Sequence, residues 1–316
     1  MVQPHRCFWC ARSQNVTAYQ VTHRTTYRYG SNMSSAHLLV GLSPRSLPTQ
    51  QVRDHQLFCT PEPTHRAQFD DANGNHLSYL TLSAPHNMLN LVALSWIDVE
   101  APPPVPEIRM TWEDVVASTV ADRSSAGVDA RELRLPSRYV SPSAALLSYA
   151  ASTFVGRRDI VDALRDLSHR IFTEFTFDPE FSDVATPLSE VLEHRRGVCQ
   201  DFAHLYIGCA RSVGLAARYV SGYLETDPPP GRPKLQGADA SHAWCSIYVP
   251  SFGWIDVDPT NDQLPPRRHI TIGWARDYAD IAPIRGVLIG PPASQDIEVA
   301  VDVVAQPDPA LLNAPR

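Results

Sequence analysis

Apolar and polar residues alternate in short runs through the first third of the chain, and residues typical of turns separate the runs. The predicted strands cover residues 19–29, 37–42, 52–59, 76–82 and 89–99. Pro44 and Pro61 follow two of the runs, and Asn73-Gly74 has the chemistry of a tight hairpin turn. Several short strands at regular spacing indicate an antiparallel β-domain or β-sandwich.

Helical periodicity replaces this alternation in the middle of the chain. Apolar residues recur at i, i+4, i+7 and i+11 from Ile160, which predicts a helix over 159–171. Further helices are predicted over 142–154, beginning after the cap-like Ser141, and over 187–193, where a proline stands at the start. Strands followed by helices that pack on an antiparallel sheet indicate an α+β fold.

Changes in this pattern divide the chain into segments. A proline-rich stretch at 101–106 is stiff, and the residues after it show little periodicity, so they predict a connector that carries at most short helices. Alternation returns at 297–303 and predicts a last strand, whose partner the pattern does not identify. The predicted segments are an unstructured and dispensable leader (1–15), an N-terminal β-domain (16–101), a connector (102–140), a core (141–290) and a terminal strand with a tail (291–316).

Residues 195–205, Arg-Arg-Gly-Val-Cys-Gln-Asp-Phe-Ala-His-Leu, carry the first candidate chemistry. Gly197 permits a tight turn just before Cys199. From Phe202 onward, apolar residues recur at helical spacing until Gly214, where a helix would stop. Cys199 is therefore expected at a helix N-terminus, where unpaired backbone N–H groups and the helix dipole favour a thiolate. A buried structural cysteine is the alternative that this stretch leaves open.

Two later stretches predict a hairpin that carries a histidine and a carboxylate. Residues 241–249 and 253–258 have the pattern of strands, and a short Pro/Gly loop joins them. Neighbouring strands can place His242 beside Asp258. Alternation puts Asp256 on the same face as Asp258, so spacing does not choose between the two carboxylates. Taken singly, the histidine could be a core residue and Asp258 a turn cap.

Together these residues predict covalent catalysis by a triad of Cys199, His242 and Asp258. His242 takes the thiol proton or holds it in an ion pair, and later protonates the leaving amine. Asp258 accepts a hydrogen bond from the other ring nitrogen and fixes the tautomer. The backbone N–H of Cys199 is one expected donor to the oxyanion, and a second donor is not assigned.

Residues 197–204 (Gly-Val-Cys-Gln-Asp-Phe-Ala-His), 242–244 (His-Ala-Trp) and 253–261, which end in Asp-Pro-Thr-Asn, are three motif blocks in order. They resemble the bacterial transglutaminase-like cysteine peptidase family. The resemblance extends upstream to residues 19–29 and downstream to 273–286. It implies that family's N-terminal β region, followed by a papain-like superfamily core in its transglutaminase arrangement, and it favours Asp258 because this residue opens the Asp-Pro-Thr-Asn block.

The resemblance implies an amide-bond hydrolase, a peptidase or amidase that forms a thioester and acts on a peptide or protein. We favour water as the acceptor because the family is usually described by peptidase resemblance and because the acidic residues do not form a calcium loop. The alternatives are a transamidase, in which an amine takes the acyl group, and a binding module whose triad is unused. The proline-rich loop 225–237, which leads to His242, is either a specificity loop or a plain connector.

Composition and charge exclude several classes of binding partner and cofactor. A formal charge of −7 argues against nucleic acid. No signal peptide or membrane span is apparent, so we expect a cytoplasmic location and no membrane partner. Cys7 and Cys10 lack the second pair of a zinc ribbon, and the six histidines between 23 and 86 lack ligand spacing, so no metal and no cofactor are expected. The oligomeric state is left open.

Overall fold

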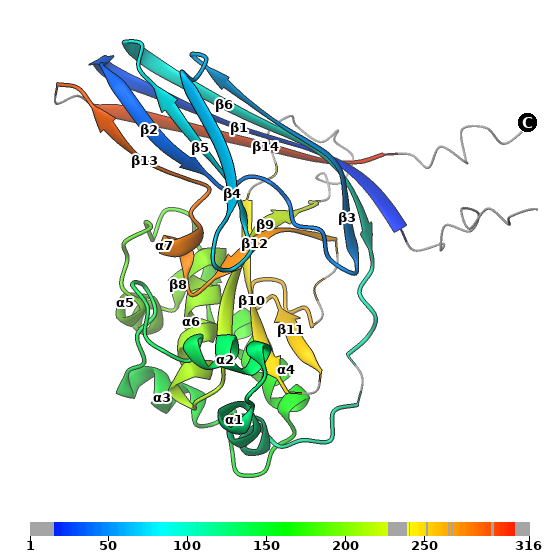
Figure 1. Ribbon diagram of the computed structural model, residues 1–316. Helices are drawn as coiled ribbons and strands as arrows, with labels where there is room; N and C mark the ends of the chain where they lie inside the picture. Colours follow the sequence, from blue (N-terminus) through cyan, green and yellow to red (C-terminus); the bar gives the residue numbers. More distant parts are fainter. Residues whose placement is uncertain are drawn as a thin grey trace, which may run out of the picture.

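The computed structural model describes residues 16–105, 107–226, 239, 241–250, 252–264, 266, 268–291 and 294–306. Within them, a pair of antiparallel sheets lies against a mixed layer of helices and a third sheet (Figure 1). This arrangement confirms the predicted α+β fold. The predicted leader, with Cys7 and Cys10, and most of the proline-rich loop before His242 lie outside the described residues.

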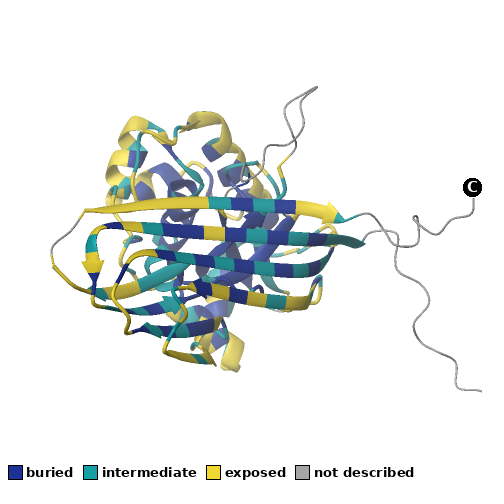
Figure 2. Ribbon diagram, turned by 90° about the horizontal axis from the view of Figure 1, so that it is seen from above, coloured by how far each residue is buried: buried dark blue, intermediate teal, exposed yellow. Residues whose placement is uncertain are grey.

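The strands of the first part form two four-stranded sheets, with the orders β14-β1-β6-β3 and β13-β2-β5-β4. Their bounds are β1 (Val16–Met33), β2 (Ser35–Val40), β3 (Gln50–Thr60), β4 (His65–Asp70), β5 (His76–Leu82), β6 (His86–Glu100), β13 (Ile284–Ile289) and β14 (Gln295–Gln306). Side chains of both sheets share one apolar cluster, which includes Leu38 of β2, Leu80 of β5 and Leu91 of β6. The two sheets therefore pack as a sandwich. Figure 2 shows the resulting stripes of buried and less buried residues along the strands of one sheet.

The last two strands return to this sandwich. β14 pairs antiparallel with β1, and β13 pairs antiparallel with β2, where Ile284 lies opposite Val40. The last strand is thus where alternation predicted it, and its partner is now identified. Residues 284–289 fall inside the predicted segment 141–290, and they pair with the N-terminal sandwich; the boundaries between the predicted segments stay predictions. Strand pairing is non-local, so the pattern of residues 284–289 could not reveal it.

The core has one antiparallel sheet of the order β11-β10-β9-β12. Its strands are β9 (Ala217–Leu224), β10 (Ser241–Val249), β11 (Gly253–Val257) and β12 (His269–Ala275). The helices are α1 (Trp112–Ala121), α2 (Ser125–Glu132), α3 (Ala144–Ala150), α4 (Ile160–Glu174), α5 (Leu188–His194), α6 (Cys199–Ser212) and α7 (Tyr278–Ile281). A short parallel pair, β7 (Thr176–Phe177) and β8 (Arg196–Gly197), lies directly before α6.

Helix α6 is the centre of this core. Its buried residues pack with apolar side chains of β9, β10 and β11, and the Tyr206 hydroxyl donates to the carbonyl of Leu164 in α4 at 3.0 Å. The helix predicted from the periodicity after Cys199, buried against an antiparallel sheet, is confirmed.

Local capping explains where three of the other helices begin. α4 begins after Asp159, whose carboxylate accepts from the N–H groups of Val161 and Asp162. α3 begins after Ser143, so the helix predicted from Ser141 over 142–154 is shorter than expected, since it is the Ser143 hydroxyl that caps the N–H of Leu146. The predicted connector holds two helices, and α1 begins in a capping box.

The sandwich and the core meet in a second apolar cluster. Tyr19, Ile97 and Val301 of the sandwich pack with Tyr223 and Ile270 of the core. The loop between β4 and β5 adds polar contacts. The Asn75 side chain accepts from the N–H of Trp274 at 3.0 Å and donates to its carbonyl at 2.9 Å. These contacts fix β12 against the sandwich. None of the described helices has the length and apolar character needed to span a bilayer.

Candidate active site

Cys199 lies where the sequence places it, at the first position of α6, and its side chain is partly exposed. The helical ladder begins with the N–H of Phe202, which donates to the carbonyl of Val198 at 3.0 Å. The N–H of Cys199 itself precedes this ladder, so it has no partner within the helix. The carbonyl oxygen of a substrate bound beside the sulfur would therefore lie near the positive end of the helix dipole.

The turn before the nucleophile is held by Asp201. One oxygen of its carboxylate accepts from the N–H of Val198 at 2.8 Å and from the Ser182 hydroxyl at 2.5 Å. Burial raises the pKa of Asp201. A Cβ at Gly197 would lie 2.8 Å from the same carboxylate oxygen, so only glycine fits there. Gly197 thus allows the backbone of the turn to lie close to the Asp201 side chain.

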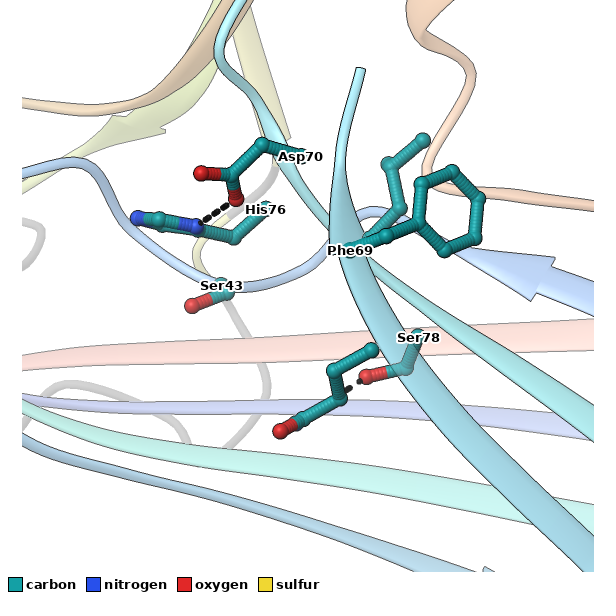
Figure 3. A pocket seen from close by; sticks show the side chains of 7 residues that line it. Ser43, Phe69, Asp70, His76 and Ser78 are labelled. Carbon is teal, nitrogen blue, oxygen red and sulfur yellow. Dashed lines mark hydrogen bonds and ion pairs between the residues drawn. The ribbon is translucent and has the colours of Figure 1, made fainter.

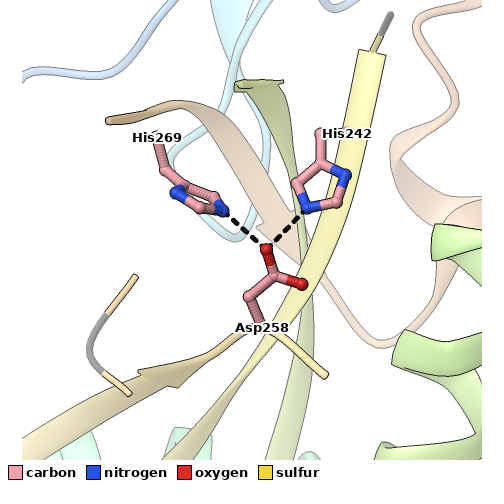
Figure 4. Close-up of side chains that lie close together, drawn as sticks. All are labelled: His242, Asp258 and His269. Atoms are coloured by element: carbon pink, nitrogen blue, oxygen red, sulfur yellow. Dashed lines mark hydrogen bonds and ion pairs between the residues drawn. The ribbon is translucent and has the colours of Figure 1, made fainter. Parts of the chain in front are cut away.

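His242 and Asp258 come from the predicted hairpin. β10 and β11 pair antiparallel, with Cys245 opposite Val257, and the chain reaches Asp258 directly after β11. The Nε2 atom of His242 lies 2.8 Å from Oδ2 of Asp258 (Figure 4). Cys199 lies close enough to this ring to contribute to the raised pKa of His242. Since Asp258 takes Nε2, Nδ1 is the ring nitrogen left for sulfur.

The Asp258 carboxylate is fully buried, and both of its oxygens accept hydrogen bonds. Oδ2 also accepts from His269 Nε2 at 2.8 Å and from Asn261 Nδ2 at 2.7 Å, while Oδ1 accepts from the N–H of Thr260 at 2.9 Å. Asn261 closes the Asp-Pro-Thr-Asn motif, which by itself gives the residue no role. His269 is a single histidine at a strand start, and the sequence does not reveal its contact because no local pattern connects it to a residue eleven positions earlier.

Electrostatics favour an ion pair between His242 and Asp258. Burial lowers the pKa of His242, but hydrogen bonds with Asp258 and Cys199 outweigh this effect and raise the pKa to about 10. Burial raises the pKa of Asp258, but hydrogen bonds from His242 and His269 hold it well below its usual range. A carboxylate that stays ionised keeps its partner imidazole protonated.

Asp256, the competing carboxylate, has a different partner. It lies opposite Ser246 in the hairpin and accepts from the Ser246 hydroxyl. This bond lies within the hairpin and does not involve His242. The geometry therefore brings His242 together with Asp258.

His242, Asp258 and His269 are also the one group in the described part of the chain that is compact enough for a metal ion, with ligand atoms within 4.8 Å of one another. The two separations of 2.8 Å are those of N–H···O hydrogen bonds, and each Nε2 atom then carries the proton. We interpret the group as hydrogen-bonded. The absence of a metal site stays a prediction.

The remaining described cysteines have a different environment. Cys59, Cys209 and Cys245 are all buried. Burial raises the pKa of Cys59 to about 11 and that of Cys209 to about 12, and it also raises the pKa of Cys245 well above its ordinary value. These thiols stay protonated near neutral pH and are poor nucleophiles. Cys199 differs from them because it is partly exposed and beside a histidine.

A separate cavity of about 320 Å³ lies on the sandwich (Figure 3). His76 points toward Asp70 there, with Ser43 and Ser78 nearby. The side chains of His76 and Asp70 are both more than half exposed, and the Ser78 hydroxyl accepts from Gln68. An exposed ion pair of this kind lacks the burial of the Cys199 site, so we do not assign chemistry to it.

Comparison with known proteins places these residues in a family context. Residues 148–259 match the transglutaminase-like superfamily, and residues 19–98 match the bacterial transglutaminase-like N-terminal region. An uncharacterised protein of Mycobacterium tuberculosis is 41% identical over 295 residues, which cover 90% of this chain and 92% of that protein. A protein-glutamine gamma-glutamyltransferase of Pseudomonas aeruginosa is 28% identical over 139 residues, 43% of this chain and 21% of that protein.

The fold has a match among solved structures. A candidate cysteine protease from Cytophaga hutchinsonii superposes with a TM-score of 0.71 at 20% identity, covering 92% of this chain and 91% of the other. The match extends over both the sandwich and the core, so the two parts occur together in another protein.

Proposed function

We propose that this chain, which belongs to the transglutaminase-like superfamily and carries the bacterial N-terminal region of that family, is a cysteine-dependent hydrolase of amide bonds in peptides or proteins. The observation that carries the proposal is the buried contact of 2.8 Å between Nε2 of His242 and Oδ2 of Asp258, on a ring whose pKa Asp258 and Cys199 both raise. A cysteine at a helix N-terminus, an imidazole and a carboxylate are the groups that thioester chemistry needs.

The proposed reaction has two steps. The Cys199 thiolate attacks the amide carbonyl carbon, the C–N bond breaks, and the leaving amine takes a proton from His242, which leaves a thioester. Water then attacks the thioester carbon while His242 accepts a proton from that water. The C–S bond breaks, the acid product leaves, and the thiolate and the imidazolium are restored. The N–H of Cys199 donates to the oxyanion in both steps.

The acceptor of the acyl group separates hydrolysis from transamidation. We favour water, as in the sequence analysis, and the fold is that of a candidate cysteine protease. One observation favours an amine instead, namely the similarity of 139 residues to a protein-glutamine gamma-glutamyltransferase. Transamidation is therefore the second candidate, and it uses the same thioester.

A peptide survey in ¹⁸O-labelled water tests the proposal. A mixture of peptides would be incubated with the wild-type protein and with Cys199→Ala, each with and without an added primary amine, and the products identified by mass spectrometry. We expect ¹⁸O in newly formed carboxyl groups for the wild type and no products for the variant, since the variant lacks the nucleophile.

Each other result changes a different part of the proposal. Amine-linked peptides in place of labelled acids would make the protein a transamidase. Products that persist in Cys199→Ala would remove the nucleophile assignment. A folded wild-type protein that yields no product from any peptide would support the binding module.

A further inference from the structure

One oxygen of Asp258 serves two histidines. Nε2 of His242 and Nε2 of His269 each lie 2.8 Å from Oδ2, and Figure 4 shows both rings pointing toward that oxygen. The carboxylate is fully buried, and His269 is 8% exposed. The reaction proposed above uses the first ring and gives no role to the second. A buried imidazole on the orienting carboxylate is close enough to influence it.

The sheet places the two rings on either side of β9. His242 lies on β10 opposite Gly222, and His269 lies on β12 opposite Leu224. Gly222 stands between the two strands, and a Cβ there would lie 2.6 Å from the Trp244 ring. The missing side chain leaves space for the indole, which packs edge-on against the His269 ring with centroids 5.0 Å apart.

The His269 ring is therefore held by two independent contacts. Its hydrogen bond fixes one ring nitrogen on Asp258, and the Trp244 contact fixes the plane of the ring. Trp244 also stacks on the His242 ring, with centroids 6.1 Å apart. One indole thus positions both imidazoles. An Nε2–H donor held in this way keeps Oδ2 oriented toward His242 whether or not substrate is bound.

We propose that His269 is a positioning residue for the reaction of Cys199, acting through Asp258; this inference rests on the proposed function. Its N–H fixes Oδ2 in the position that His242 needs. The same N–H also weakens the interaction between the carboxylate and the protonated His242, because an oxygen that already accepts a hydrogen bond stabilises a second donor less strongly. The balance between the thiolate–imidazolium pair and the neutral pair then depends on His269.

Arg268 and Asp256, two charged residues near His269, have partners of their own. Arg268, the preceding residue, pairs with Glu225 at 2.9 Å, and Asp256 accepts from Ser246. Glu100, Asp256, Arg268 and His269 line a cavity of about 230 Å³ between the core sheet and the connector. Among the described residues, Asp258 and, at 5.3 Å between ring centroids, His242 face the His269 ring.

Two variants separate the hydrogen bond from the packing. His269→Gln keeps an N–H donor at about the distance of Nε2, whereas His269→Met has the same chain length without a donor. The cavity beside His269 gives space for either unbranched side chain. If His269→Met does not fold, His269→Asn, whose amide is too short to reach Asp258, replaces it.

The measurement is the pH dependence of Cys199 alkylation by iodoacetamide in the full chain, with thermal melts as a folding control. Trypsin releases residues 197–211, and fragment ions distinguish Cys199 from Cys209 in this peptide. In His269→Met the Asp258 carboxylate stabilises the protonated His242 more strongly, and the protonated ring in turn stabilises the Cys199 thiolate. The midpoint of the alkylation profile should therefore fall by on the order of one pH unit. His269→Gln should stay within about 0.3 pH unit of the wild type.

Turnover gives a second readout. With a peptide that the survey identifies, kcat should fall on the order of tenfold in His269→Met, with KM nearly unchanged and most of kcat restored in His269→Gln. Equal midpoints in all three proteins, or equal shifts in both variants, would overturn the role of His269. The midpoint is measurable even if the protein hydrolyses nothing, so a failure of the proposed function is distinguished from a failure of this inference.

Discussion

At the scale of single residues, three side chains define the candidate site: Cys199 at the first position of α6, and the buried His242 and Asp258, whose Nε2 and Oδ2 atoms lie 2.8 Å apart. Local patterns in the sequence predicted all three. A glycine, a helix start and a hairpin are each encoded within a few positions. His269 was missed because its contact with Asp258 arises from the order of strands in the sheet. Asp258 and Asp256 share a face by alternation, and the family resemblance favours Asp258; the structure pairs Asp258 with His242 and Asp256 with Ser246. The catalytic roles stay a proposal that substitutions can test.

The first prediction compares the two carboxylates. In Asp258→Asn an amide replaces the acceptor of the imidazole N–H, and we expect kcat/KM to fall on the order of 10- to 100-fold, less than in serine enzymes. Asp256→Asn removes the acceptor of a hairpin bond and should change kcat/KM by less than about twofold. Both variants are assayed on one peptide, with melts to confirm folding. A larger loss for Asp256→Asn would reassign the orienting role.

The second prediction concerns pH and stability. The pKa of His242 is about 10 in the folded state and 6.5 ordinarily, so its ion pair stabilises the fold fully below pH 6.5, less as pH rises, and not above about 10. The depressed pKa of Asp258 acts in the opposite sense, since its contribution is lost as pH falls below the ordinary value of 3.8. The stability difference between wild type and His242→Gln should therefore shrink between pH 6.5 and 10.

Denaturant unfolding at several pH values measures that difference. His76→Gln is the matched control, because the His76–Asp70 pair is more than half exposed and water screens it. Its effect on the free energy of unfolding should be small at every pH. A His242→Gln difference that stays constant from pH 6.5 to 10 would mean that the buried ring is not protonated in the folded state.

At the scale of elements, strongly patterned segments were predicted and weakly patterned ones were not. α4, α6 and the hairpin of β10 and β11 agree with periodicity and turn chemistry. β4 was missed because its residues are mostly exposed, as suits an edge strand whose polar sequence shows no alternation. α3 was predicted too long because two serines stand near its start and only the coordinates identify Ser143 as the cap.

At the scale of the whole molecule, the last strand pairs with the first, and no local sequence pattern encodes this pairing. β14 follows the core in sequence and pairs with β1 at the start of the sandwich. Val301 and Val303 of β14 are buried with side chains of both the sandwich and the core. The last strand therefore holds the two parts together. The predicted boundaries between segments and the cytoplasmic location stay predictions.

The third prediction tests this closing strand. Val301 is fully buried in the cluster between sandwich and core, whereas Val299, two positions away on the same strand, is half exposed. Val301→Ala should lower the free energy of unfolding by about 2 kcal/mol through lost burial and a cavity. Val299→Ala should change it by less than about 0.5 kcal/mol. Equal effects in chemical denaturation would mean that β14 is not packed as described.

The central claim is that Cys199 is a nucleophile activated by His242, and its alkylation by iodoacetamide at neutral pH tests this most directly. Mass spectrometry would follow the modification of each cysteine in the native wild type and in His242→Gln. We predict that Cys199 reacts much faster than the buried Cys209 and Cys245, and that its rate falls on the order of tenfold or more in the variant. A Cys199 that reacts no faster than those two, or equally fast in both proteins, would contradict the account.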